Sequence, residues 1–455
     1  MDQPPTPATP FERNPAALAW FGLAVSALAV AGMFSLVLVV GRIPGLAAEI
    51  ITSPRFAKRC LAVHVNLALV VWFYSFIASM FCLIPGRVRS RNYNLASAAL
   101  AALGVAAFVL SLPFTDGEPV LANYIPAIDH PMFFAGLGAF ALAVALNFVD
   151  GRLFSNNLGT QSDMPEPAIR GLRAAGAAFF IALTTFAATW WTLTEGSGVD
   201  LGLLFWGGGH VLQFVSVCGM LAAWSIMLHG LTGRSPVGKR ASMVLFAVLI
   251  APLPLAPVIP LAEWRQSAYT TLMQWGIFPA VSLFLILCFN QLYLARRDGR
   301  LPKPGSRDVR LIGFFTAATM TVFGFILGAL ITEETTLVPA HYHLSIGAVT
   351  ATFMAMSYGM MERFGMAPRG RKITRLVPFQ PLIFGIGQSI FAFGLAMAGT
   401  WGAAERKTYG KDQVLHTTGE VAGLWVMGIG GGIALVGGVI FLLAVINGWR
   451  SRKWD

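Results

Sequence analysis

The sequence predicts an all-α polytopic membrane protein. Its 455 residues are 56% hydrophobic and only 12% charged, and the mean hydropathy is +0.67. A soluble domain rarely carries so few charges. The apolar residues gather in stretches of about 20, which is the length that an α-helix needs to cross a bilayer. The basic residues are unevenly divided between alternate connections, as expected for a chain that crosses a membrane repeatedly.

Twelve apolar segments can be marked, and none shows the alternation of a membrane strand. The first follows a Pro-rich tail and is followed by Gly and Pro rather than by small cleavage-site residues, so we interpret it as an anchor. Segment seven contains "APLPLAPVIP", and we expect its outer end to be kinked or non-helical. The segments are 17–40, 61–85, 95–113, 128–149, 172–193, 203–228, 241–261, 268–295, 311–331, 336–361, 378–400 and 420–448.

These segments divide the chain into a disordered cytoplasmic tail (1–16), one twelve-helix membrane domain (17–448) and a second cytoplasmic tail (449–455). With both termini inside, the cytoplasmic parts hold 24 of the 32 Lys and Arg, and the opposite loops hold 8. This is the asymmetry of the positive-inside rule. The basic loops are therefore predicted to flank a lipid bilayer, and no nucleic-acid partner is expected.

Five of the seven histidines lie near the outer ends of the predicted helices. A hydrogen bond to a neighbouring helix is the ordinary explanation for one such histidine, but several at one depth favour a shared cofactor. The other two, His229 and His416, are expected at the membrane interface, and for His130 we favour a hydrogen bond at the start of its helix. The five are His64, His130, His210, His341 and His343.

His341 and His343 stand two residues apart in "LVPAHYHLSIGAVTA". Two residues on an α-helix correspond to about 200° of rotation, so the two imidazoles point to opposite sides. They are poorly placed to bind one metal together, but they can bind two cofactors that flank the same helix. A haem with two histidine ligands is six-coordinate, whereas a haem with one keeps a position open for a gas.

At this point the chain resembles subunit I of the haem-copper oxidase superfamily, which includes terminal oxidases and nitric oxide reductases. "HYHLSIGAVTA" is similar to the family's helix ten, which implies that His341 binds a high-spin haem and His343 a low-spin haem. "CLAVHVNLALVVWFYSF" resembles helix two, with His64 as the second ligand of the low-spin haem. "WGGGHVLQF" resembles the start of helix six, where His210 would be the first copper ligand.

The chain departs from this family at the copper site. Helix seven of the family supplies an adjacent His-His pair, but "LIAPLPLAPVIPLAEW" contains no histidine, and copper on His210 alone would be under-coordinated. The family tyrosine four residues after the helix-six histidine is Phe214 here, and "HVLQFVSVC" lacks the acid of nitric oxide reductases. In the external loop, Arg406 and Lys407 match the basic pair that binds haem propionates, with an ordinary interfacial charge pair as an equal alternative.

The resemblance implies a respiratory oxidoreductase of a bacterial inner membrane, with its haem ligands near the external side. Electrons would pass from the low-spin to the high-spin haem, where His341 and His210 would be the catalytic residues for reducing dioxygen or nitric oxide. The alternative is a copper-free dihaem subunit for electron transfer or gas binding, with His210 as a distal hydrogen-bond donor or second axial ligand. No CxxCH motif for covalent haem occurs, so the electron donor would be a separate subunit, cytochrome c or a quinol.

Overall fold

Twelve helices in the computed structural model are long and apolar enough to cross a membrane, which confirms the predicted fold class. The structure describes residues 14–85, 90–114, 116–154, 164–194, 200–262, 266–302, 307–333, 335–402 and 408–452. Each of the twelve helices overlaps one predicted segment. The first begins and the last ends on the same side of the bundle, because the number of crossings is even. The assignment of that side to the cytoplasm stays a prediction from the positive-inside count.

Most spans are single α-helices, but spans two, seven and eleven are each built from consecutive shorter elements. Single helices form α1 (Pro15–Val40), α5 (Arg91–Leu110), α6 (Pro131–Phe148), α7 (Glu166–Thr194), α8 (Leu201–Thr232), α11 (Gln266–Arg297), α12 (Val309–Ala329), α13 (Leu337–Arg363) and α16 (Thr418–Arg450). Composite spans are α3 (Pro54–Val65) with η1 (Asn66–Val71) and α4 (Trp72–Cys82), α9 (Lys239–Ile250) with η3 (Leu253–Leu255) and α10 (Ile259–Ala262), and α14 (Arg371–Leu376) with η4 (Val377–Phe379) and α15 (Gln380–Gly402). Short elements in the connections are α2 (Ala47–Ile50), β1 (Glu118–Val120), β2 (Ala127–Asp129), η2 (Gly151–Leu153) and η5 (Gly410–Asp412).

Two spans depart from a regular α-helix. Span seven breaks after α9, where the prolines of "APLPLAPVIP" remove backbone donors, as the sequence predicts. Span two contains the π-helix η1, which the sequence did not predict. It begins at Asn66, whose Nδ2 donates to the carbonyls of Ala62, at 2.8 Å, and of Pro126, at 2.6 Å. Pro126 precedes β2 of a two-stranded antiparallel hairpin beside α3, another unpredicted element.

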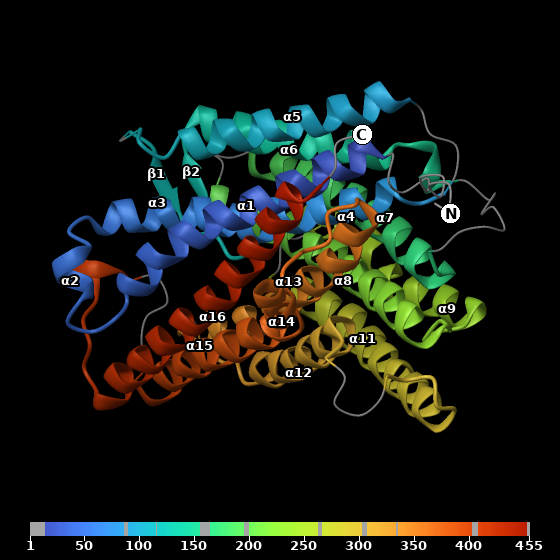
Figure 1. Cartoon of the computed structure of the whole chain (residues 1–455). Helices are drawn as coiled ribbons and strands as arrows, with labels where there is room; N and C mark the ends of the chain where they lie inside the picture. Colours follow the sequence, from blue (N-terminus) through green and yellow to red (C-terminus); the bar gives the residue numbers. More distant parts are fainter. Residues whose placement is uncertain are drawn as a thin grey trace.

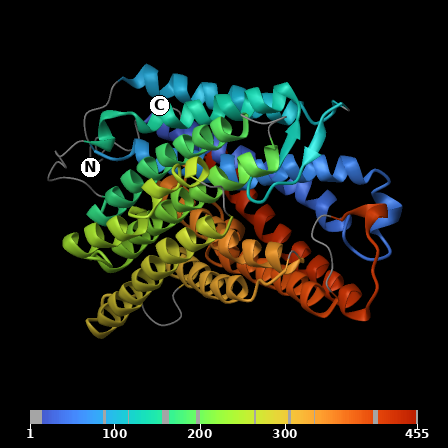
Figure 2. The same cartoon turned by 180° about the vertical axis from the view of Figure 1, so that it is seen from behind.

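The bundle encloses α8 and α13, which lie near its middle in Figure 1. Helices α5 and α6 pack together on one side, and α11, α12 and α15 lie on the other, while α16 runs diagonally from α15 to α1; Figure 2 shows the same order from behind. Spans two, six and ten are the most enclosed, since 72%, 89% and 83% of the residues in their most apolar windows are buried. All three begin at the end of the bundle that carries His64, His210, His341 and His343. We call this the histidine end, and the other the opposite end.

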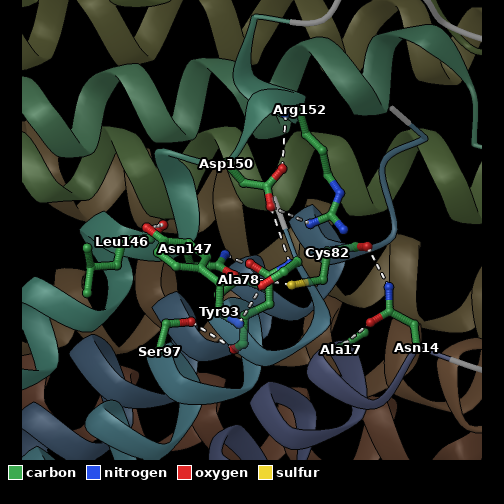
Figure 3. A network of polar contacts seen from close by, with 12 residues as sticks. Asn14, Ala17, Ala78, Cys82, Tyr93, Ser97, Leu146, Asn147, Asp150 and Arg152 are labelled. Carbon is green, nitrogen blue, oxygen red and sulfur yellow. Dashed lines mark hydrogen bonds and ion pairs between the residues drawn. The ribbon is translucent and has the colours of Figure 1, made fainter. Parts of the chain in front are cut away.

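At the opposite end, spans two, three and four are joined by buried polar contacts (Figure 3). The Cys82 thiol donates to Asn147 Oδ1 at 3.2 Å, and Asn94 Nδ2 donates to the Asp150 carboxylate at 3.3 Å. Arg152 Nη1 lies 3.7 Å from the same carboxylate. Asp150 is 0% and Arg152 3% exposed, so this ion pair is part of the packed interior.

Candidate functional site

The three most enclosed spans keep accessible surface at the histidine end. From position 70 to 84 every residue of span two is buried, and so is every residue of α13 from 347 to 358. This accessible surface lies on helices that protein otherwise encloses. From Leu61 onward, the half-buried residues at this end of span two are Leu61, His64, Val65, Ala68 and Leu69, and those at this end of α13 are Pro339, His341, Tyr342, His343, Ser345 and Ile346.

His64 and His343 converge from α3 and α13. His64 Nδ1 lies 2.8 Å from the carbonyl oxygen of Ala31 on α1. His343 Nδ1 lies 3.1 Å from Oε1 of Gln388 on α15. His64 is also close enough to His343 to interact with it electrostatically, as is Arg42 at the end of α1. The structure therefore brings together the two histidines assigned to the low-spin haem.

His341 turns toward a different helix. Its Nδ1 lies 2.7 Å from the carbonyl oxygen of Gly324 on α12, and Ser345 Oγ lies 3.4 Å away. A Cβ placed on Gly328 of α12 would come within 2.8 Å of the ring, so this glycine allows the imidazole to pack against the α12 backbone. His341 thus contacts α12 while His343 contacts α15, in agreement with the rotation inferred from their spacing.

The hydrogen bonds of these three histidines fix their tautomers. In each ring Nδ1 faces a carbonyl or amide oxygen, which can only accept, so Nδ1 carries the hydrogen and the lone pair is on Nε2. Within the described part of the chain, no residue hydrogen-bonds to any of these Nε2 atoms. Metal-binding histidines are held in this way by an acceptor on the second nitrogen. The residues present therefore fit haem iron at His64, His341 and His343.

His210 lies on α8 and is 7% exposed. Its Nδ1 is 2.5 Å from the carbonyl oxygen of Trp206, and its ring stacks on the Trp206 ring at a centroid distance of 3.9 Å. The same bond pattern leaves Nε2 as the free nitrogen. Between positions 204 and 228, the half-buried residues of α8 are Trp206, Gln213 and Val217, all on the His210 face because they follow helical spacing.

The His210 face of α8 is directed toward the His341 face of α13. Trp224 continues the His210 face, and its Nε1 donates to Thr352 Oγ1 on α13 at 2.9 Å. Thr352 comes 11 residues after His341, about three full turns, and therefore shares its face. The two faces touch at this bond and retain accessible surface nearer the histidine end.

The region expected to complete a copper site is apolar. In the broken part of span seven, Leu253 and Ala256 are fully buried. Phe214 lies against this region, since its ring and Pro252 would both meet a Cβ placed on Gly276 of α11. Among the described residues, no group of three or more His, Cys, Asp or Glu could hold a metal ion. The donor set around His210 therefore does not fit copper.

The other two outer histidines make local contacts at helix starts, and the basic pair lies outside the described residues. His130 caps α6, because its Nδ1 accepts from the Met132 N–H at 3.2 Å, and its ring stacks on Phe114. This is the helix-start role favoured from the sequence. His416 lies before α16, and its backbone N–H donates to Glu420. Arg406 and Lys407 lie outside the described residues, so their assignment to haem propionates stays a prediction.

Sequence reasoning missed two residues that shape the histidine cluster. Gln388 orients His343, and the only signal for it is a single amide inside the apolar run "FGIGQSIF". Arg42 is 6% exposed, with its guanidinium carbon 4.3 Å from the centre of the Tyr409 ring. In the sequence, Arg42 is a cation directly after the first apolar segment, and such a residue looks like an ordinary charged loop residue.

The fold defines a twelve-span membrane bundle of the oxidase type, with paired histidines on its central helices. The chain belongs to the family described as cytochrome c and quinol oxidase polypeptide I, whose model matches residues 15–434. Membership places it among multi-pass respiratory membrane proteins that bind haem. A solved structure with the same fold is a heme-copper terminal oxidase dimer, at a TM-score of 0.79 and 16% identity, covering 97% of this chain and 85% of that one.

Two curated relatives carry no function in their names. An uncharacterized protein of Aquifex aeolicus (strain VF5) is 26% identical, over 80% of this chain and 89% of the relative. The uncharacterized protein RP382 of Rickettsia prowazekii (strain Madrid E) is 24% identical, over 94% of this chain and 95% of the relative. Both matches span most of the relative.

Proposed function

We propose that this chain is the dihaem subunit of a respiratory oxidoreductase, with a low-spin haem on His64 and His343 and a high-spin haem on His341. Such a haem pair supplies one-electron transfer and an open iron position for dioxygen or nitric oxide. The observation that supports this most is the accessible surface of the central spans around these histidines, in helices that are otherwise buried.

The chain's own residues set the orientation of each imidazole. The carbonyl oxygens of Ala31 and Gly324 and the amide oxygen of Gln388 each hold one Nδ1–H, which directs Nε2 away from that partner. Such acceptors also make the opposite nitrogen a better ligand. Because His341 and His343 stand two residues apart on α13, the two haem sites flank one helix.

On the gas side, we propose that His210 lies beside the gas without belonging to a three-histidine copper site. Its Nδ1–H is held by the Trp206 carbonyl, so Nε2 presents a lone pair and would accept a hydrogen bond rather than donate one. In the broken part of span seven the fully buried side chains, Leu253 and Ala256, are aliphatic, and Phe214 replaces the family's tyrosine. These features favour a copper-free subunit that binds or reduces the gas. A terminal oxidase with copper on His210 is the second candidate, and the family membership is what favours it.

The remaining parts of the proposal follow from the family and the charge pattern. Arg406 and Lys407 would provide cations for haem carboxylates. Electrons would arrive through a separate subunit, from cytochrome c or from a quinol. The protein would lie in the inner membrane of a bacterium, with its haem ligands near the external side.

The deciding experiment measures the haem, iron and copper content of the purified protein, with reduced-minus-oxidised and carbon monoxide difference spectra. We expect two haems per chain, one of which binds carbon monoxide, and essentially no copper. Stoichiometric copper would favour the terminal oxidase and contradict the copper-free assignment. A protein that retains no haem after expression with sufficient haem supply would contradict the function itself.

A further inference from the structure

One side-chain amide nitrogen on the His210 face of α8 has no hydrogen-bond partner among the residues that the structure describes. The Nε2 atom of Gln213 is buried and makes no hydrogen bond with any described residue. Three other glutamines inside the spans are bonded: Gln291 to Thr232, Gln380 to Gly437, and Gln388 to His343. A buried amide without a hydrogen-bond partner costs free energy. We therefore expect a membrane protein to retain such an amide where a bound molecule can accept its hydrogen bond.

Gln213 shares the face of α8 that is directed toward His341. It follows His210 by three residues, so the two side chains are neighbours on the helix surface. It is half-buried on a helix whose surrounding residues are buried, and the half-buried Trp206 and Val217 lie above and below it. The accessible surface of this face therefore includes the Gln213 amide.

The register of α8 against α13 puts Gln213 level with His341. These helices are the sixth and tenth of twelve alternating spans, so they run in the same direction. The hydrogen bond from Trp224 to Thr352 fixes one point of contact. Gln213 precedes Trp224 by 11 residues, and His341 precedes Thr352 by 11, so both lie roughly 16 Å back along their helices from that contact.

We propose that Gln213 donates a hydrogen bond to the diatomic gas on the His341 side and thereby selects among gases. This inference rests on the proposed function. A carboxamide offers two neutral N–H donors and does not titrate, so it contributes polarity without exchanging a proton. Dioxygen and nitric oxide gain negative charge on the atom remote from ferrous iron, whereas carbon monoxide gains little. A fixed donor at that atom therefore favours dioxygen and nitric oxide over carbon monoxide.

The test compares gas binding to the reduced, haem-loaded protein in the native chain and in Gln213→Met and Gln213→Leu. Both variants remove the donors, and both replace an unpartnered amide by an apolar group that a packed membrane helix tolerates. We expect nitric oxide to dissociate about tenfold faster, the loss expected for one hydrogen bond. We expect the C–O stretching frequency of the carbon monoxide adduct to rise, because removing a donor weakens back-donation, while carbon monoxide affinity changes little.

Gln291→Leu is the matched control, because it removes a glutamine near the opposite end of the bundle, and it should leave both readouts at native values. If the native protein forms a carbon monoxide adduct that His341→Ala abolishes, the proposed function stands. Unchanged nitric oxide dissociation and C–O frequency in both Gln213 variants would then overturn this inference alone. If the native protein forms no such adduct, the proposed function fails first, and this inference falls with it.

Discussion

The polar side chains in the two halves of the central helices differ in their hydrogen-bond partners. Toward the opposite end, several buried polar groups bond within the protein. Trp224 donates to Thr352, Ser357 donates to the Phe353 carbonyl, and every α13 residue from 347 to 358 is buried. At the histidine end, the imidazoles of His64, His210, His341 and His343 each have Nδ1 bonded, while Nε2 has no partner among the described residues. One half of each helix thus packs against protein, and the other half keeps accessible surface around the histidines.

The largest effect expected from this comparison is the loss of a whole haem. His343→Ala should remove the bis-histidine low-spin spectrum and keep the carbon monoxide response, because His341 contacts a different helix. His341→Ala should remove the carbon monoxide response and keep the low-spin spectrum. The measurement is a set of difference spectra at equal protein concentration.

Thr352→Val serves as the control, since it lies on α13 in the packed half and should keep both spectra. If His341→Ala and His343→Ala leave both spectra intact, α13 is not the haem-bearing helix. If either variant removes both haems while the protein stays folded, the two faces of α13 are not independent sites.

A second large effect is expected at the opposite end, where it should concern stability alone. Asp150→Ala leaves Arg152 buried without its carboxylate, and removal of one partner of a buried ion pair typically costs about 3–5 kcal/mol of unfolding free energy. The measurement is the midpoint of denaturant unfolding in detergent, with haem content determined before denaturant is added. A native midpoint would show that this polar cluster contributes little, and loss of one specific haem would show that the two ends are not separate in role.

An intermediate effect is expected from Gly328→Val. Since even a Cβ at this position would lie 2.8 Å from the His341 ring, the bulkier side chain must displace the imidazole. We expect the carbon monoxide-binding haem to be retained only in part, with a normal low-spin spectrum. Gly432→Val on α16 is the matched control, because a Cβ there meets nothing within 4 Å. Equal haem content in the two variants would contradict the packing of His341 against α12.

Much of the fold could be predicted from the sequence, because apolar length decides which segments span a membrane. The break in span seven was also predictable, since proline removes a backbone donor wherever it stands. The divergence of His341 and His343 follows from helical rotation alone. In each case the determining physics is local to one helix.

What sequence reasoning missed depends on contacts between distant segments. The π-helix η1 begins at Asn66, which is bonded to Pro126 of a hairpin about 60 positions later. The partner of His343 is a glutamine 45 positions away, and only packing decides which helix supplies it. The sequence gives no signal for Gln213, because a single amide in an apolar run indicates neither which neighbouring helix it faces nor whether it has a hydrogen-bond partner. The haem roles of the histidines stay predictions that the experiments above address.

The smallest effect concerns the start of α12 at the opposite end, where Asp308 is the N-cap. Its carboxylate accepts from the Arg310 N–H at 2.9 Å and from Arg310 Nη2 at 2.6 Å. Burial raises the pKa of Asp308, but the hydrogen bonds from Arg310 outweigh this, so the pKa is lower than usual. A lowered folded-state pKa contributes stability that is present above the ordinary aspartate pKa and is lost as the pH falls through the folded-state value. Asp308→Ala should lower the unfolding free energy by about 1 kcal/mol at neutral pH and remove this acid-dependent loss, while both haem spectra stay native. Asp308→Asn, which keeps the cap without the charge, should recover most of the neutral-pH stability, and equal midpoints for the native and alanine chains would contradict a stabilising cap.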